Sequence, residues 1–338
     1  MQKPLPCPVT VLGGYLGAGK TTVLNHLLRH AGGRRIAVVI NDFGELNIDA
    51  DLVEGRTDDM ISIAGGCVCC GFGDDLLDTL QRLRDAPEPF DHVVIETSGV
   101  ALPRNLRAAI SLAPGLAVAA TIVLADAESV RRQAADRYMG DTVRDQLESA
   151  DLLLLTKCDL LPAVEVDAVQ TWLSGQAPAP VLRTVRGEVP IEVLLGDFER
   201  TAPRPAAPVA NAPGTDALAA DAPPRTSRLL GSAAGTLRPP AHATARYDTA
   251  AFTVPAPVDP PRLAAALARL APPLVRAKGL VPAADGRLQA VQLVGRRWSV
   301  DPAPAGAAGE GRLVAIAAGE PLDRDAVRTA IAQARLDP

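Results

Sequence analysis

One segment constrains the fold more than any other: Gly14–Thr21, with the sequence GYLGAGKT, fits the pattern G-x-x-x-x-G-K-[ST]. An apolar, β-branched run at Val9–Gly13 precedes it, and Lys20–Leu28 carries apolar residues at helical spacing. Glycines let the backbone curl so that successive N–H groups point inward at phosphate oxygens, and the positive end of the following helix adds to that attraction. The pattern therefore predicts a P-loop between the first strand and the first helix of the chain.

This loop gives individual residues specific roles. The Lys20 ammonium is expected to reach the β- and γ-phosphates of a nucleotide, and the Thr21 hydroxyl to bind Mg²⁺. A glycine-rich turn that binds nothing is the weaker interpretation, because a strand and a helix flank the pattern in the required order. The expected nucleotide contacts are Gly14, Gly17, Ala18, Gly19, Lys20, Thr21 and Thr22.

Short apolar runs alternate with helical patterns from residue 9 to about residue 185. Such alternation with nearly continuous apolar strands predicts the α/β fold of P-loop NTPases, a mostly parallel sheet with helices on both faces. A further helix is expected after Asp141, where Val143 and Leu147 lie on one stripe. The strands are expected at Val9–Gly13, Ile36–Ile40, Asp58–Ile63, His92–Glu96, Thr121–Asp126, Leu152–Thr156 and Val181–Thr184.

The pattern changes after Leu195, which closes a predicted P-loop GTPase domain at residues 1–195. Residues 196–245 are rich in Ala and Pro and have no sustained period of 2 or 3.6, so they are predicted to be a linker. Residues 246–338 are patterned again and predict a smaller α+β domain with antiparallel hairpins. Its elements are expected at Tyr247–Val254, Pro261–Leu270, Leu274–Val281, Leu288–Val294, Arg297–Val300, Arg312–Ala317 and, as a final helix, from Asp323.

Charge and hydropathy exclude two classes of partner. The 338 residues include 34 basic and 39 acidic side chains, a formal charge of −5, which argues against a nucleic-acid binder that relies on a basic face. The longest weakly polar run, Ile110–Ala125, is short of the roughly 20 residues that cross a bilayer. No convincing secretory signal stands at the N-terminus, so the expected location is the cytoplasm.

A second motif lies at the end of the predicted strand His92–Glu96. A carboxylate at the carboxyl end of a strand beside the P-loop is where a Walker B residue addresses Mg²⁺ or its waters, so Glu96 is expected to orient or activate water. Ser98 and Gly99 follow it and could present a backbone N–H to the γ-phosphate. An ordinary solvated strand end would give the same local pattern, and the neighbouring P-loop favours the functional interpretation.

A third motif, Thr156-Lys157-Cys158-Asp159, follows the buried run Leu152–Leu155 and resembles the N-K-x-D guanine motif of GTPases. In that motif the Asp carboxylate accepts hydrogen bonds from guanine N1 and N2, and the Lys stem lies over the base. Adenine offers no such pair of donors, so Asp159 favours GTP. Thr156 stands where GTPases usually carry Asn. An ordinary strand-to-helix turn capped by Asp159 is the alternative.

Three of the five cysteines lie within four residues, in Cys67-Val68-Cys69-Cys70. The spacing of Cys67 and Cys70 lets two sulfurs face one ion, and Cys69 is near enough to be a third donor. Three local ligands leave a tetrahedral site one short, as expected of a site that passes its metal on. Thiolates favour Zn²⁺, and Co²⁺ accepts the same geometry.

Other interpretations of the cysteines remain open. A redox pair would use the same C-x-x-C spacing, and buried inert thiols in a tight turn would need no ligand. Cys7 and Cys158 lie outside the cluster and are expected to be structural. His26 and His30 have the i, i+4 spacing of a metal pair, but an exposed helix face is the favoured explanation.

Together these residues resemble the CobW-type P-loop GTPases, relatives of the nickel-inserting GTPases of hydrogenase and urease maturation (the CobW/HypB/UreG-like group). The similarity covers the P-loop, the Glu96–Gly99 segment as an E-x-S-G Walker B, and residues 65–70 as a GG-C-x-C-C metal motif. Asn41–Asp49 is similar to a switch segment usually seen as N-E-F-G-E-x-x-x-D. Arg276–Gly279 matches an R-x-K-G signature of the CobW C-terminal domain.

The resemblance implies a GTP-hydrolysing metallochaperone. GTP binding would organise the switch loops, the Cys motif would hold the divalent ion, and hydrolysis would favour delivery to a client metalloprotein. Asp49 is the implied ligand of the nucleotide Mg²⁺, and Asp42 that of the delivered ion. Asp42 stands where Glu is common and is one methylene shorter.

Two other functions stay open on the sequence. One is a P-loop kinase or ATPase that acts on a small molecule, against which the guanine motif argues. The other is a metal- or redox-sensing module with a vestigial nucleotide site. The sequence names no client, does not fix the metal, and leaves open whether the chain forms a homo-oligomer.

Overall fold

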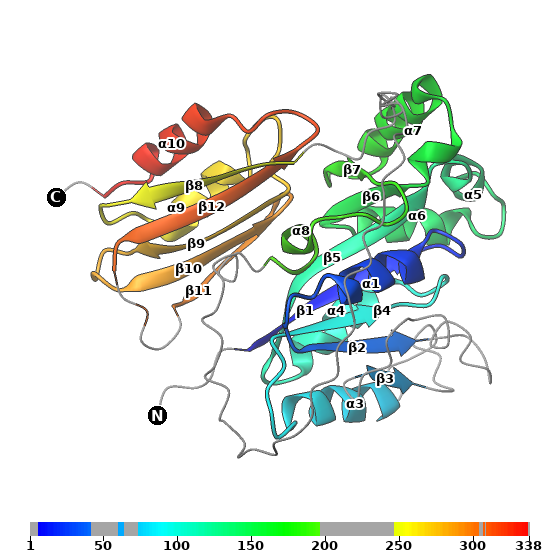
Figure 1. Ribbon diagram of the computed structural model, residues 1–338, viewed down its shortest axis with the longest axis horizontal. Helices are drawn as coiled ribbons and strands as arrows, with labels where there is room; N and C mark the ends of the chain where they lie inside the picture. The colour runs from blue at the N-terminus through cyan, green and yellow to red at the C-terminus, as the bar shows by residue number, and fades with distance from the viewer. Residues whose placement is uncertain are drawn as a thin grey trace, which may run out of the picture.

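The computed structural model describes residues 6–41, 60–63, 74–196, 247–303, 307 and 309–336, and side chains in all of these except 41, 60–63 and 74–77. The N-terminal described part forms a seven-stranded sheet in the order β3-β2-β4-β1-β5-β6-β7, and every neighbouring pair is parallel (Figure 1). The strands are β1 (Cys7–Gly14), β2 (Ile36–Asn41), β3 (Met60–Ile63), β4 (His92–Glu96), β5 (Leu116–Asp126), β6 (Leu152–Thr156) and β7 (Val181–Arg183).

Helices cover both faces of this sheet. On one face, apolar residues of β1, β2, β4 and the start of β5 pack against α3 and α4. On the same face, residues of the end of β5 and of β6 pack against α6 and α7. The alternate residues pack with α1 and α8 on the opposite face. The helices are α1 (Lys20–Arg29), α3 (Asp74–Arg84), α4 (Pro103–Leu112), α5 (Val130–Ala134), α6 (Gly140–Glu148), α7 (Ala163–Gln176) and α8 (Ile191–Leu195).

The strand order locates the ligand edge of the sheet. The chain leaves β1 for β2 on one side, whereas it leaves β4 for β5 on the other side of β1. Ligands of open parallel sheets bind beyond the carboxyl ends of the strands at such a reversal. The P-loop follows β1 at this point.

Residues from Tyr247 onward form a five-stranded antiparallel sheet in the order β11-β10-β9-β12-β8. Two helices, each begun by an Asp side chain that caps backbone N–H groups, pack their apolar residues on one face of it. Helix α8 lies between the two sheets (Figure 1). The elements are β8 (Tyr247–Val254), α9 (Pro260–Leu267), β9 (Arg276–Pro282), β10 (Leu288–Val294), β11 (Arg297–Pro302), β12 (Gly311–Ala318) and α10 (Arg324–Gln333).

The fold confirms the predicted parallel α/β sheet and the second α+β sheet, with most strand ends within two residues of the expected ones. The exception is β5, which begins at Leu116 instead of Thr121. Its first residues pair with the start of β1, across a register shift between Val9 and Thr10. The predicted linker, apart from Gly196, lies outside the described residues. Among the described helices, none is both long and apolar enough to cross a membrane.

Candidate nucleotide site

The P-loop leaves β1 in a conformation that its glycines make possible. Gly14 has a φ of 137°, and a Cβ there would lie 2.7 Å from the Leu124 carbonyl oxygen of β5. Gly19 has a φ of 93° immediately before α1. Side-chain-bearing residues rarely adopt either conformation, so both positions favour glycine. The loop therefore turns back over the edge of the sheet and directs the N-terminus of α1 at this edge.

Lys20 and Thr21 open α1, as the sequence predicts. Lys20 is buried, and its Nζ donates a hydrogen bond to the Gly14 carbonyl at 3.0 Å, so the side chain folds back along the loop. Thr21 is half-buried, and Thr22 is exposed. The lysine charge, the helix N-terminus and the loop amides together provide a positive site for phosphate groups.

Glu96 lies where the sequence places a Walker B carboxylate. It ends β4 opposite Leu12 of β1, two residues before the P-loop begins, and it is 2% exposed. A carboxylate and the Thr21 hydroxyl are hard oxygen donors of the kind that Mg²⁺ prefers in nucleotide sites. The donor set is therefore suited to a nucleotide-bound Mg²⁺.

The Ser98–Gly99 turn packs against the P-loop. A Cβ on Gly99 would lie 2.8 Å from the Leu16 backbone nitrogen, so the two backbones approach too closely for a side chain. The Ala101 amide donates to the Ser98 carbonyl at 3.1 Å and closes the turn. Ser98 and Gly99 are both buried. The turn and the P-loop are therefore in direct backbone contact.

The base motif is joined directly to the P-loop. Thr156, which ends β6 and is 4% exposed, donates a hydrogen bond from Oγ1 to the Ala18 carbonyl at 2.8 Å. Lys157 has a left-handed φ of 58°, and its Nζ pairs with Asp126 Oδ2 at 2.8 Å. Asp159 follows in a short 3-10 helix and is exposed. The motif therefore lies at the same sheet edge as the P-loop.

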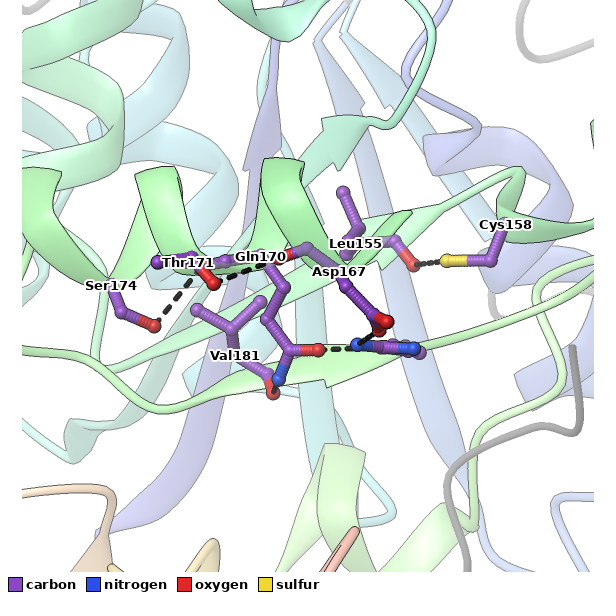
Figure 2. A network of polar contacts seen from close by, with 8 residues as sticks. Leu155, Cys158, Asp167, Gln170, Thr171, Ser174 and Val181 are labelled. Atoms are coloured by element: carbon purple, nitrogen blue, oxygen red, sulfur yellow. Dashed lines mark hydrogen bonds and ion pairs between the residues drawn. The ribbon is translucent and has the colours of Figure 1, made fainter. Parts of the chain in front are cut away.

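Cys158, expected to be structural, is buried within this motif. Its Sγ donates to the Leu155 carbonyl at 3.1 Å, and Figure 2 shows this contact together with the polar contacts of Gln170 with β7. Burial raises the pKa of the Cys158 thiol to about 11, and burial likewise raises that of Cys7 to about 11. Both thiols stay protonated near neutral pH, which makes them poor metal ligands.

The loop after β7 is a neighbour of the site that sequence patterns did not single out. Gly187 has a φ of 73°, and a Cβ there would lie 3.0 Å from the Thr22 backbone carbon and the Val23 nitrogen. The His26 ring forms a hydrogen bond with the Val189 carbonyl at 3.0 Å. The loop is thus fitted to the first turns of α1. Gly187 after a strand is the one local signal, and many surface turns share it.

The predicted metal ligands other than Thr21 lie outside the described residues: Cys67, Cys69, Cys70, Asp42 and Asp49. Within the described ranges, no three His, Cys, Asp or Glu side chains gather as a metal site would require. His26 and His30 stack with ring centroids 4.3 Å apart, and each ring bonds to a backbone carbonyl. These contacts favour the structural interpretation of the pair.

Comparison with known proteins gives relatives for this arrangement. Two proteins called "Zinc chaperone CobW" are similar: that of Sinorhizobium sp is 35% identical over 219 residues, and that of Pseudomonas aeruginosa is 36% identical over 225. Each alignment covers 56% of this chain, and they cover 62% and 59% of the two relatives. The chain thus spans about three fifths of the length of these curated relatives.

Among solved structures, the Zn(II)-bound YjiA GTPase of E. coli aligns over 99% of this chain and 100% of its own, with 26% identity and a TM-score of 0.43. Residues 247–335 match the family described as the cobalamin synthesis protein cobW C-terminal domain. Residues 8–182, more than half of the chain, match the family described as the CobW/HypB/UreG nucleotide-binding domain. The chain therefore belongs to the CobW/HypB/UreG family.

Proposed function

We propose that the chain is a GTP-hydrolysing metallochaperone that carries Zn²⁺ to a client protein. The observation that carries the GTP part is the hydrogen bond from Thr156 to the Ala18 carbonyl, which joins the base motif to the phosphate loop. Asp159 follows Thr156 in the next turn, which supports its assignment to the base. A carboxylate there pairs with the two guanine donors and has no such partner on adenine.

In this proposal the chain supplies position and charge to the transferring phosphoryl group. Lys20 and the amides that open α1 stabilise negative charge on the phosphate oxygens. Thr21 would hold Mg²⁺, which supplies charge neutralisation at the phosphates when bound. Glu96, buried at the end of β4, orients the attacking water and accepts its hydrogen bond.

Zn²⁺ is the cargo in this proposal, and Cys67, Cys69 and Cys70 are its ligands, with Asp42 as a further candidate ligand and Asp49 assigned to Mg²⁺. Support comes from thiolate chemistry and from the relatives named as zinc chaperones. Co²⁺ would fit the same ligands. In the sequence, the Cys segment lies between the switch segment and the Walker B strand, so contacts to the γ-phosphate could bias its shape.

Nucleotide selectivity tests the GTP part. We expect the wild-type chain to bind GDP and GTP far more tightly than ADP and ATP in calorimetric titrations, and to release phosphate from GTP. Asp159→Ala should raise the Kd for GDP by at least about tenfold, the loss typical of a hydrogen bond to a charged group, and leave weak ADP binding unchanged. Lys157→Ala, in the same motif, should weaken the binding of both GDP and ADP.

Two results would favour the other functions. Equal affinity for ATP and GTP, with GDP binding insensitive to Asp159→Ala, would indicate a kinase or ATPase. A wild type without GTPase activity, whose zinc affinity is unchanged by Lys20→Ala, would indicate a metal-sensing module with a vestigial nucleotide site.

A further inference from the structure

A buried glutamine outside all of the recognised motifs holds the turn beside the P-loop. Gln146 on α6 is 1% exposed, and its Nε2 donates to the Gly99 carbonyl at 3.1 Å and to the Ala101 carbonyl at 2.8 Å. Two carbonyl acceptors require the two N–H bonds of the amide, which fixes the orientation of the side chain. One side chain thus secures two carbonyl groups of the Ser98–Ala101 turn.

The restrained turn has its amide groups available. The Ser98 carbonyl accepts from the Ala101 amide, and the Gly99 and Ala101 carbonyls accept from Gln146. Across the part of the chain that the structure describes, the amides of Ser98 and Gly99 donate to no recorded acceptor. A turn with its carbonyls bound on one side and its N–H groups unused is arranged to receive an anion.

The helix that carries Gln146 also contacts the P-loop itself. Met139, immediately before α6, accepts a hydrogen bond from the Tyr15 hydroxyl. Val143 and Leu147 of α6 lie in the same apolar cluster as Tyr15. One short helix therefore holds the P-loop at one end and the Ser98–Ala101 turn near the other, so the relative position of the two depends on α6.

We propose that Gln146 is a positioning residue for the γ-phosphate. By holding the Gly99 carbonyl, it sets the amides of Ser98 and Gly99 at the distance from the P-loop where a third phosphate would lie, and it thereby favours GTP over GDP. The inference rests on the proposed GTPase function and adds to it the residue that makes the turn read the γ-phosphate. Hydrogen bonds that are in place before the ligand arrives need no reorganisation during the reaction.

Gln146→Leu tests this role, with Gln170→Leu as the matched control. Gln170 also donates from its amide to a backbone carbonyl, that of Val181 in the edge strand β7, away from the P-loop. We expect Gln146→Leu to lower kcat for GTP by about tenfold or more and to lower the affinity for a non-hydrolysable GTP analogue, with the Kd for GDP within about twofold of wild type. Gln170→Leu should leave all three unchanged.

A purely structural Gln146 would give a different result. In that case Gln146→Leu would lower the melting temperature but leave kcat and the preference for the GTP analogue over GDP at wild-type values, which overturns the inference while the GTPase proposal stands. A wild type that hydrolyses no GTP overturns both. If Gln146→Leu does not fold, hydrogen exchange on the wild type decides: residues 98–101 should be more protected with the GTP analogue than with GDP, and equal protection contradicts the role.

Discussion

Thr156 stands where GTPases usually carry Asn, and its hydroxyl still forms a hydrogen bond to the P-loop. The sequence alone could not say what that change costs. The structure gives the hydroxyl a defined acceptor, the Ala18 carbonyl in the P-loop. The residue thus joins the two halves of the site, which a short branched side chain at the end of a strand can do.

Removing the Thr156 hydroxyl should weaken the binding of GDP and of GTP equally. Thr156→Val keeps the shape and loses the donor, so we expect the Kd for GDP and for GTP to rise about fivefold, equivalent to about 1 kcal/mol for one buried hydrogen bond. Thr156→Ser keeps the hydroxyl and should remain within about twofold of wild type. Calorimetric titration of all three proteins measures this, and equal affinities in wild type and Thr156→Val would contradict it.

His92 gives the chain a predictable response to acid. It begins β4, is 3% exposed, and its ring nitrogen meets the Thr10 hydroxyl at 2.8 Å. Burial, and then the charges of Arg276, Lys278 and Arg34, hold the pKa of His92 well below its usual value of 6.5. The folded chain therefore keeps this imidazole neutral under conditions in which the unfolded chain binds a proton.

Protonation of His92 in the unfolded chain should make the free energy of unfolding depend on pH. Above pH 6.5 the ring is neutral in both states and contributes no pH dependence. Below it the unfolded state binds more protons, so the free energy of unfolding should fall by up to about 1.4 kcal/mol per pH unit. Urea denaturation between pH 7.5 and 5.5 measures the slope, and His92→Gln should make it shallower. Identical slopes in the two proteins would contradict this account.

Among the elements, the loop after β7 packs directly against the helix that follows the P-loop. Gly187 lies against the backbone of Thr22 and Val23 at the start of α1. Any side chain there has to displace the first turns of α1, whose amides are the proposed phosphate ligands. The loop thus supports the geometry of α1 without contributing a recognised motif.

Gly187→Ala tests this support, and Gly33→Ala is its control. Both glycines have nearly the same left-handed φ, 73° and 74°, but a Cβ on Gly33 meets nothing within 4 Å. Each substitution should therefore lower the free energy of unfolding by about 1 kcal/mol through its backbone conformation. Only Gly187→Ala should also weaken GDP binding, and equal GDP affinities in the two variants would show that the contact does not matter.

Features set by neighbouring residues could be predicted from the sequence, and contacts between distant segments could not. The strands β4, β6, β8 and β10 have the predicted ends, because continuous apolar runs and their polar boundaries are local features. The common position of the P-loop, Glu96 and the Thr156–Asp159 motif at one edge was also predictable, because parallel strands bring their carboxyl ends to one edge. The contacts of Gln146 and Gly187 were not predictable, since they join segments that are distant in the sequence.

At the scale of the whole molecule, Arg276 joins the two sheets. Its Nη1 donates to the Val193 carbonyl at 2.9 Å and to the Leu194 carbonyl at 3.4 Å, at the end of α8. Arg276 is 2% exposed, and burial lowers the pKa of its guanidinium to about 9. The guanidinium lies against Gly196 and leaves no room there for a Cβ. The Leu194 carbonyl also accepts from Thr10 of β1 at 3.0 Å, so the contact reaches the strand that precedes the P-loop.

A second polar contact supports the same interface. Asp151, 7% exposed, accepts from the Thr121 amide at 2.8 Å, and Arg297 of β11 approaches it to 3.2 Å. Arg107 of α4 lies 3.5 Å away on the other oxygen. The carboxylate is therefore shared between the parallel sheet and the antiparallel one, which adds a second polar contact between them.

Loss of the Arg276 side chain should loosen the attachment of the antiparallel sheet. Arg276→Met removes the donors and leaves the Val193 carbonyl buried, so we expect the free energy of unfolding to fall by about 1–3 kcal/mol and limited proteolysis to become faster. Arg312→Met, at an exposed arginine on β12, should have neither effect. Equal stability and equal cleavage in the two variants would show that Arg276 does not hold the interface.

In the proposed function the bound nucleotide controls metal binding, and a zinc titration measures this coupling. Zn²⁺ affinity would be measured on the full chain with GDP and with a non-hydrolysable GTP analogue, with a Cys67/Cys69/Cys70 triple Ala variant as control. We expect tighter binding with the GTP analogue, by about tenfold or more, equivalent to a coupling of about 1.4 kcal/mol, and loss of this binding in the variant. The same affinity with both nucleotides would contradict the coupled mechanism even if both sites exist.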